Sequence, residues 1–169
     1  SAVRDGIRLH RRIDRYTDAH PLFRRSRQRL HPDYRRYGGI LIDLFYDHLL
    51  AVQWEHHHPQ TLDAFVSDIH RLLRARWDEL PPRMQHSMRY LLAHDLLRSY
   101  RHRSGVATAL RGLERRLSRP SNLGMAIEEL DRHGREFEAD FTLFFPDLIT
   151  HTRYLQQMLD VRAEIDPHT

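Results

Sequence analysis

The stretch that most constrains this chain is residues 40–54, which are apolar apart from Asp43, Asp47, His48 and Gln53. A helix that is apolar nearly all round is normally buried, and a buried carboxylate is costly unless it is paired, protonated or bound to a cation. Asp43 and Asp47 are four residues apart, so on a helix they face the same way and repel each other. We therefore expect a positive charge beside them, either a metal ion or a buried arginine.

Helical periodicity dominates the rest of the chain, and no segment alternates like a strand over more than a few residues. This predicts an all-α fold, with residues 1–169 forming a single helical bundle of about seven or eight helices. Asp18 is a suitable N-cap for the second helix. The expected helices cover about residues 3–17, 21–30, 40–58, 61–80, 82–102, 106–118 and 123–145, with a turn at Gly105, a loop at 120–122 and Pro146 opening the last helix.

The first predicted helix has arginines on one side and apolar residues on the other, but His10 and Asp14 fall on the apolar side. They are four residues apart, so they can hydrogen-bond to each other or converge on one ligand. His48 points about 100° away from Asp47, so the two share a metal only if it lies between their directions. The chain has no cysteine, so any metal site must use nitrogen and oxygen ligands.

The basic residues point to an acidic partner. All 27 lysine-plus-arginine positions are arginine, and the formal net charge is +4. Nucleic acid and an acidic protein both qualify, and the densest stretch, either a solvated helix face or a docking patch, contains Arg24, Arg25, Arg27, Arg29, Arg35 and Arg36. No apolar run is long enough to span a bilayer and no signal-peptide pattern is present, so we expect a soluble, cytoplasmic protein without a membrane partner. The oligomeric state is not predicted.

Three segments resemble the bacterial acyl carrier protein phosphodiesterases, a family of HD-domain-like helical phosphohydrolases. The first is Gly6-Ile7-Arg8-Leu9-His10-Arg11-Arg12-Ile13-Asp14 followed by Thr17-Asp18 and Pro21; the second runs from Asp43 through Asp47-His48-Leu49 to Trp54; the third, looser match spans 141–147. The resemblance covers nearly the whole chain. Family members normally begin with a further segment holding a His-Leu-x-Leu-Ala-like stretch and a Gly-Asn-x-x-x-Asp-Phe motif. Because this chain starts after both, we expect an N-terminally truncated protein whose metal site lacks one or two ligands.

The resemblance implies hydrolysis of the phosphodiester between 4'-phosphopantetheine and a serine of holo-acyl carrier protein, with a divalent metal, typically Mn²⁺. By the same resemblance His10, Asp47 and His48 match metal-site positions, and Asp14, Asp18 and Asp43 are candidates for catalytic support. The expected partner is then the acidic carrier protein and not nucleic acid. On the helical wheel Arg11 and Arg12 face solvent, so we assign them, with the arginines listed above, to docking of that partner.

Two alternatives remain open at this stage. One is another HD-like enzyme that hydrolyses a nucleotide or a small phosphoester. The other is a non-catalytic basic helical module that binds nucleic acid or an acidic protein. The two aspartates that face one way in helix 40–54 favour the enzymes, because a binding module has no need of them.

Overall fold

The computed structural model describes residues 2–117 and 121–165, and side chains within residues 3–117 and 121–159. Over this part of the chain the all-α prediction is confirmed. The α-helices are α1 (Ala2–Ala19), α2 (Pro21–Arg29), α3 (Gly38–Val52), α4 (Trp54–His57), α5 (Leu62–Ala75), α6 (Pro82–Ala93), α7 (Leu96–Ser99), α8 (Arg103–Glu114) and α9 (Ile127–Ile165). Three short 3₁₀-helices are interspersed: η1 (Pro32–Tyr37), η2 (Trp77–Glu79) and η3 (Leu123–Ala126).

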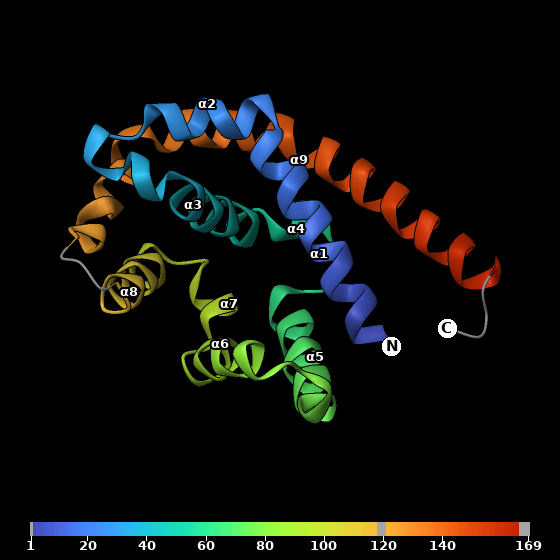
Figure 1. The fold of residues 1–169 in the computed structure, drawn as a ribbon. Coiled ribbons are helices and arrows are strands. Elements are labelled where there is room, and N and C mark those ends of the chain that lie inside the picture. The colour runs from blue at the N-terminus through green and yellow to red at the C-terminus, as the bar shows by residue number, and fades with distance from the viewer. Residues whose placement is uncertain (1, 118–120, 166–169) are drawn as a thin grey trace.

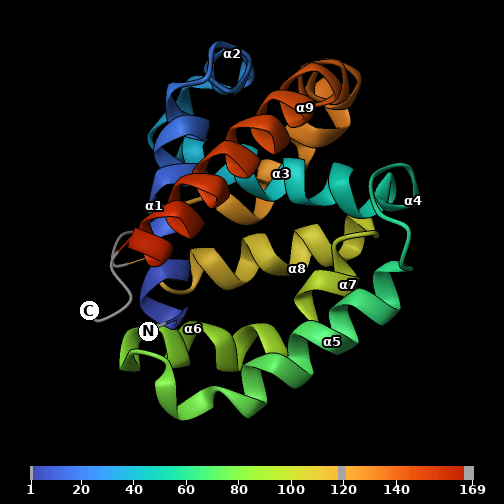
Figure 2. The same ribbon diagram turned by 90° about the vertical axis from the view of Figure 1, so that its right-hand side faces the viewer.

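The helices form two layers (Figures 1 and 2). In one layer α2 lies along α9, α3 packs beneath both, and α1 crosses α9 at the edge. In the other layer α8 packs under α3, and α5, α6 and α7 close the far side. The helix that carries the two aspartates is therefore placed between the two halves of the molecule.

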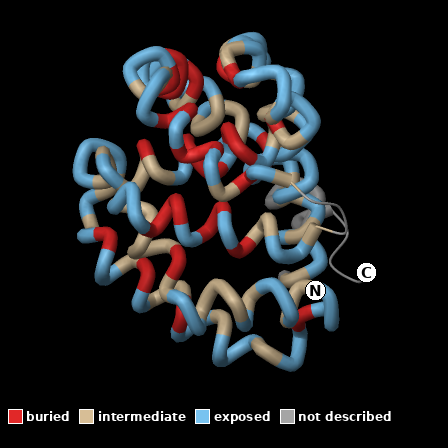
Figure 3. Tube along the Cα trace, turned by 90° about the vertical axis from the view of Figure 1, so that its left-hand side faces the viewer, coloured by how far each residue is buried: buried red, intermediate tan, exposed pale blue. Residues whose placement is uncertain are grey.

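Aromatic side chains fill the core between α2, α3 and α9. Phe23, Phe45 and Phe137 are fully buried, and the rings of Phe45 and Phe137 lie 5.5 Å apart between centroids. Burial is concentrated where the layers meet, and the outer sides of the helices are exposed (Figure 3). Phe141 and Phe144 of α9 are buried together with Phe137.

Several predicted boundaries are wrong. The helix expected over 82–102 breaks after α6, where Asp95 adopts a left-handed conformation with φ of 46°. Gly105 does not mark a turn but lies inside α8, where a Cβ atom would approach the carbonyl oxygen of Ser99 to 2.0 Å. The glycine is required by this close approach of two backbones. Residues 118–120 lie outside the described residues, so the predicted helix end at Ser118 and the loop residue Pro120 are not placed.

Pro146 does not open a new helix. It lies within α9, and the only non-helical backbone angles inside that helix are at His133, with φ of −119°. A proline forfeits one backbone hydrogen bond, but burial of Phe141 and Phe144 just before it anchors the helix to the core. Tertiary packing has overridden the local signal. Within the described residues no helix is both long and apolar enough to cross a membrane.

Candidate active site

Helix α3 is not buried all round, which corrects the first expectation from the sequence. Its core side is formed by residues such as Leu41, Ile42 and Phe45, all fully buried. Asp43 and Asp47 lie on the opposite side and their residues are exposed to solvent. The helix is apolar because it packs against both layers, and the aspartates occupy the one stripe that the packing leaves accessible.

The two aspartates are accessible and yet surrounded by protein. Loss of solvation raises the pKa of Asp43 to about 6, and the negative charges of Asp18 and Asp14 add to this effect. Burial likewise raises the pKa of Asp47 to about 7, with a contribution from the charge of Asp43. Both aspartates line a cavity on this side of α3. Perturbed carboxyl groups in a cleft are typical of functional sites.

Helix α1 contributes a second polar stripe to the same region, and its residues are spaced about one helical turn apart. Its members are His10, Asp14 and Asp18. His10 Nδ1 is 2.8 Å from an Asp14 carboxylate oxygen, so the pair forms the hydrogen bond that the four-residue spacing permits. Contrary to the helical wheel, the pair does not face the core: the two side chains are 72% and 56% exposed.

Asp18 lies over the start of α3. Its carboxylate oxygen is 4.0 Å from the position that a Cβ atom would occupy on Gly39. A negative charge at a helix N-terminus interacts favourably with the helix dipole. The N-cap of α2 is His20 and not the predicted Asp18. The Nδ1 atom of His20 accepts a hydrogen bond from the backbone N–H of Leu22. The charges of His10, Asp14 and Asp18 act on Asp43, and the charge of Asp43 acts on Asp47, so five of the six predicted catalytic or metal-site residues form one electrostatic cluster.

His48 does not join this cluster. Its Nδ1 donates a hydrogen bond to the backbone carbonyl of Tyr100 at 2.6 Å, and its ring lines a different cavity, between α3 and α9. The reason is geometric, because consecutive helical residues point about 100° apart. The expected set of His10, Asp47 and His48 is therefore not assembled. Among the described residues, no group of three or more His, Asp or Glu side chains is arranged to hold a metal ion.

Asp43 and Asp47 form one wall of a cavity of about 250 Å³ between α3, α6, α7 and α8. Four further residues of its lining are polar or charged and were missed from the sequence: Ser87, Tyr90, Tyr100 and Arg116. Burial and the nearby charge of Asp47 raise the pKa of Tyr100, so its phenol stays protonated at neutral pH. These side chains come from helices distant in the sequence, and no motif marks them.

Two of the predicted docking arginines have a structural role. Arg25 and Arg29 form ion pairs with Asp140 of α9, whose side chain is fully buried, and Ser26 donates a hydrogen bond of 2.8 Å to the same carboxylate. This network ties α2 to α9. A buried carboxylate with two arginine partners explains part of the arginine-rich stretch without any external ligand.

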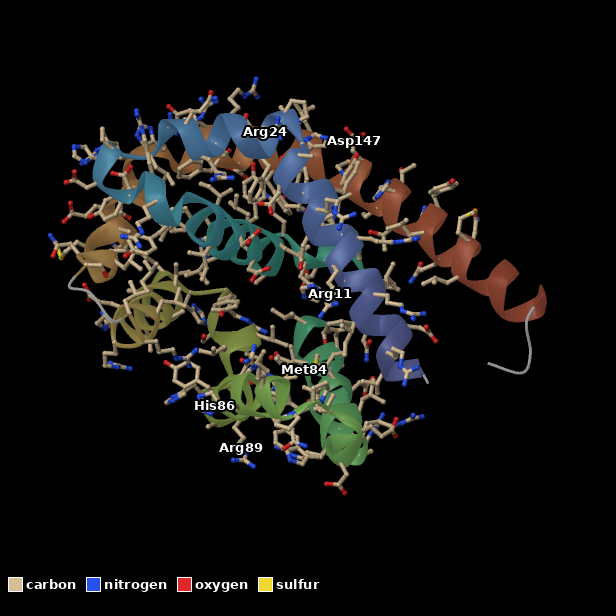
Figure 4. The ribbon with its side chains drawn as sticks, viewed as in Figure 1. Arg11, Arg24, Met84, His86, Arg89 and Asp147 are labelled. Atoms are coloured by element: carbon tan, nitrogen blue, oxygen red, sulfur yellow. The ribbon has the colours of Figure 1, made fainter. Side chains whose placement is uncertain are left out.

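The other arginines of the stretch remain candidates for docking. Arg24 on α2 and Arg11 on α1 are exposed, as are Arg12, Arg35 and Arg36 (Figure 4). Arg36 lies against the ring of Tyr37, with 5.8 Å between the guanidinium carbon and the ring centroid. Arg27 is half-buried and its charge lowers the pKa of Asp43, which places it at the edge of the cluster. Of these arginines, Arg27 is near enough to act on the aspartate pair, and the exposed ones remain free to contact a partner.

Comparison with known proteins identifies the family. The family model for acyl carrier protein phosphodiesterase matches residues 1–148. Proteins named acyl carrier protein phosphodiesterase are 32% identical in Photorhabdus laumondii, over 83% of this chain and 72% of the relative, and 30% identical in Enterobacter sp. strain 638, over 91% and 80%. The Klebsiella pneumoniae protein of the same name is 32% identical over 86% of this chain and 76% of its own length. No solved structure matches the chain. The chain, with its paired aspartates on α3 and its His10–Asp14 pair on α1, belongs to the acyl carrier protein phosphodiesterase family.

Proposed function

We propose that this protein hydrolyses the phosphodiester that joins 4'-phosphopantetheine to a serine of holo-acyl carrier protein, releasing the apo-carrier and 4'-phosphopantetheine. Membership of the phosphodiesterase family supports the reaction class. The observation that carries the proposal is the pair of accessible aspartates of α3, Asp43 and Asp47, which line a cavity and, at Asp43, feel the charges of His10 and Asp14 from α1.

The donor chemistry of the cleft fits a divalent cation. Carboxylate oxygens and imidazole nitrogen suit Mn²⁺, and the chain has no thiolate to favour a softer metal. Asp43 and Asp47 would hold the ion; no third His, Asp or Glu of the described residues is arranged to join them, and the charge of His10 acts on Asp43. A bound cation would lower the pKa of a water molecule and offset negative charge on the phosphoryl oxygens. It would also relieve the repulsion that raises the pKa of both aspartates.

The remaining chemistry falls to residues of the chain. The serine alkoxide is a poor leaving group, so a general acid must give it a proton. Because His10 Nδ1 is bonded to Asp14, the other ring nitrogen, Nε2, is the one that could present a proton to the leaving oxygen. Asp18 and Arg27 then shape the field around Asp43, the first raising and the second lowering its pKa.

The exposed arginines are suited to binding an acidic protein. Acyl carrier proteins are acidic, so exposed arginines would raise the rate of encounter and make it sensitive to salt.

The direct test incubates the protein with Mn²⁺ and holo-acyl carrier protein and measures the mass of the carrier. We expect a loss equal to the phosphopantetheine group with the wild-type chain and no loss with Asp47→Asn. Glu136→Gln, which removes an exposed carboxylate from α9, is the matched control and should retain activity. No loss with wild type, or equal loss with Asp47→Asn, contradicts the proposal. Release of phosphate from nucleotides in place of carrier cleavage indicates the other enzyme class.

A further inference from the structure

Four arginines lie on α2, and three of them have partners within the protein. Arg25 and Arg29 pair with the buried carboxylate of Asp140. Arg24 donates a hydrogen bond of 3.1 Å from Nε to a backbone carbonyl of α1. Arg27, the fourth, makes no hydrogen bond and no ion pair among the residues that the structure describes. It is therefore the arginine of α2 whose charge this part of the fold leaves unpaired.

Arg27 lies beside the beginning of the helix that carries the aspartates. Its Nε atom is 3.4 Å from the position that a Cβ atom would occupy on Gly38, the first residue of α3. Gly39, Asp43 and Asp47 follow at four-residue spacing and so share one side of that helix. The positive charge of Arg27 also lowers the pKa of Asp43, so the guanidinium is within electrostatic range of this carboxylate.

The guanidinium is near the acidic cluster without being neutralised by it. At 1.5 Å per residue, Gly38 and Asp43 are about 7–8 Å apart along α3, which leaves room for a small anion between Arg27 and the aspartate. Arg27 is partly buried, and a cation that has lost part of its solvation gains from a partner. Its nitrogen atoms are within reach of a ligand, because none is among the buried unpaired atoms, as Nε of Arg29 is.

We infer that Arg27 binds the non-bridging oxygens of the substrate's phosphodiester and holds the phosphorus beside Asp43 and Asp47. The inference rests on the proposed function. A guanidinium presents five N–H donors in a planar fork, which matches two oxygens of one phosphoryl group. Donors that are already in position at these oxygens stabilise the negative charge on them in the transition state, so Arg27 contributes to the rate as well as to binding.

The burial of Arg27 distinguishes a phosphoryl group from a carboxylate on the surface of the partner. Arg35 and Arg36 are exposed, so carboxylates of an acidic protein can contact them from outside. Arg27 is partly buried against the start of α3, and its charge acts on Asp43. A ligand of Arg27 therefore lies next to the aspartates, where the proposed reaction takes place. This gives Arg27 a role different from the docking predicted for it from the sequence.

The first test measures binding by titration calorimetry with Mn²⁺ present, so it does not depend on turnover. The probe is 4'-phosphopantetheine, and pantetheine is the matched ligand without the phosphate. We expect Arg27→Gln to weaken binding of the probe at least tenfold, and Arg27→Lys, which keeps the charge but not the fork, by about threefold. Pantetheine should not distinguish the variants from wild type.

The matched control is Arg89→Gln, which should bind the probe as wild type does. Arg89 is an exposed arginine on the outer side of α6, in the layer opposite α2, where it lies against the ring of Trp77 (Figure 4). Because Arg27 has no partner among the described residues, Arg27→Gln should shift the melting temperature by no more than about 2 °C. If Arg27→Gln does not fold, the comparison of Arg27→Lys with Arg89→Gln decides.

The second test uses holo-carrier and separates catalysis from docking. We expect Arg27→Gln to lower kcat about a hundredfold and to change KM less than threefold, because the exposed arginines dock the carrier. The inference is overturned if wild type does not bind 4'-phosphopantetheine, if Arg27→Gln binds it as tightly as Arg89→Gln does, or if Arg27→Gln raises KM at unchanged kcat. Failure of the proposed function would show differently, as holo-carrier left intact by wild-type protein whose binding of the probe still depends on Arg27.

Discussion

Replacing Asp47 with asparagine should make the metal-free protein more stable at neutral pH. Asp47 loses solvation on folding and faces Asp43 one helical turn away, so its charge opposes the folded state. Asparagine keeps the shape of the side chain and removes the charge. We therefore expect the free energy of unfolding to rise, which is the usual relation between a strained functional site and stability.

The size of the effect follows from the pKa of Asp47, which is about 7 in place of the usual 3.8. Without solvent screening, that difference corresponds to about 4 kcal/mol. The residue is exposed to solvent in the cleft, so most of this is screened and a stabilisation of about 1–2 kcal/mol remains. The same range follows from two charges about 6 Å apart at an effective dielectric constant between that of a protein surface and water.

The effect depends on pH in a defined direction. Because the pKa is higher in the folded state, folded protein binds more protons than unfolded protein between about pH 4 and pH 7. Wild-type stability thus falls as the pH rises through this window. The gain from Asp47→Asn should be about 1–2 kcal/mol at pH 8 and close to zero at pH 4.

The measurement is urea unfolding followed by circular dichroism, with EDTA present, at pH 4, 6 and 8. Glu136→Gln is the control for the loss of one negative charge elsewhere and should shift stability by less than about 0.5 kcal/mol. A second series with Mn²⁺ should stabilise wild type and leave Asp47→Asn unchanged. A destabilised Asp47→Asn at pH 8, or an equal gain at pH 4 and pH 8, would refute the reasoning.

Three further predictions concern the fold and the partner. Asp140→Asn should lower the free energy of unfolding by about 3 kcal/mol in urea, because the buried carboxylate pairs with arginines of α2; an unchanged midpoint would contradict this role. Gly105→Ala should cost about 2–3 kcal/mol in the same assay, since the Cβ atom would collide with the carbonyl of Ser99, and a stabilised variant would exclude the collision. Arg35→Ala combined with Arg36→Ala should raise KM for holo-carrier and flatten its salt dependence at constant kcat; a fall in kcat alone would remove these residues from docking.

The sequence was a good guide wherever the evidence was local. The pairing of His10 with Asp14 follows from their four-residue spacing, and the hydrogen bond is present. The divergence of His48 from Asp47 follows equally from helix geometry, and His48 does bond elsewhere. Motif resemblance identified the family, which the comparisons confirm.

Local evidence failed where packing between distant segments decided the outcome. Pro146 reads as a helix start, but α9 continues through it because the helix is anchored to the core on the preceding turns. Arg25 and Arg29 resemble a docking patch, but Asp140, more than a hundred residues away, pairs with both. A helical wheel of α1 cannot reveal that His10 and Asp14 are exposed and that their charges act on Asp43 of α3.

The sequence by itself determined that the chain is helical, that Asp43 and Asp47 share a helix face, and that their charges repel, since each of these depends on spacing along one helix. Only the tertiary structure decided which side of α3 stays accessible. That choice depends on how α8 and α9 cover the other sides of the helix, and it turned two apparently buried carboxylates into the floor of a cleft. The residues opposite them, Tyr90 and Tyr100, enter the site only because α6 and α7 fold back beneath α3.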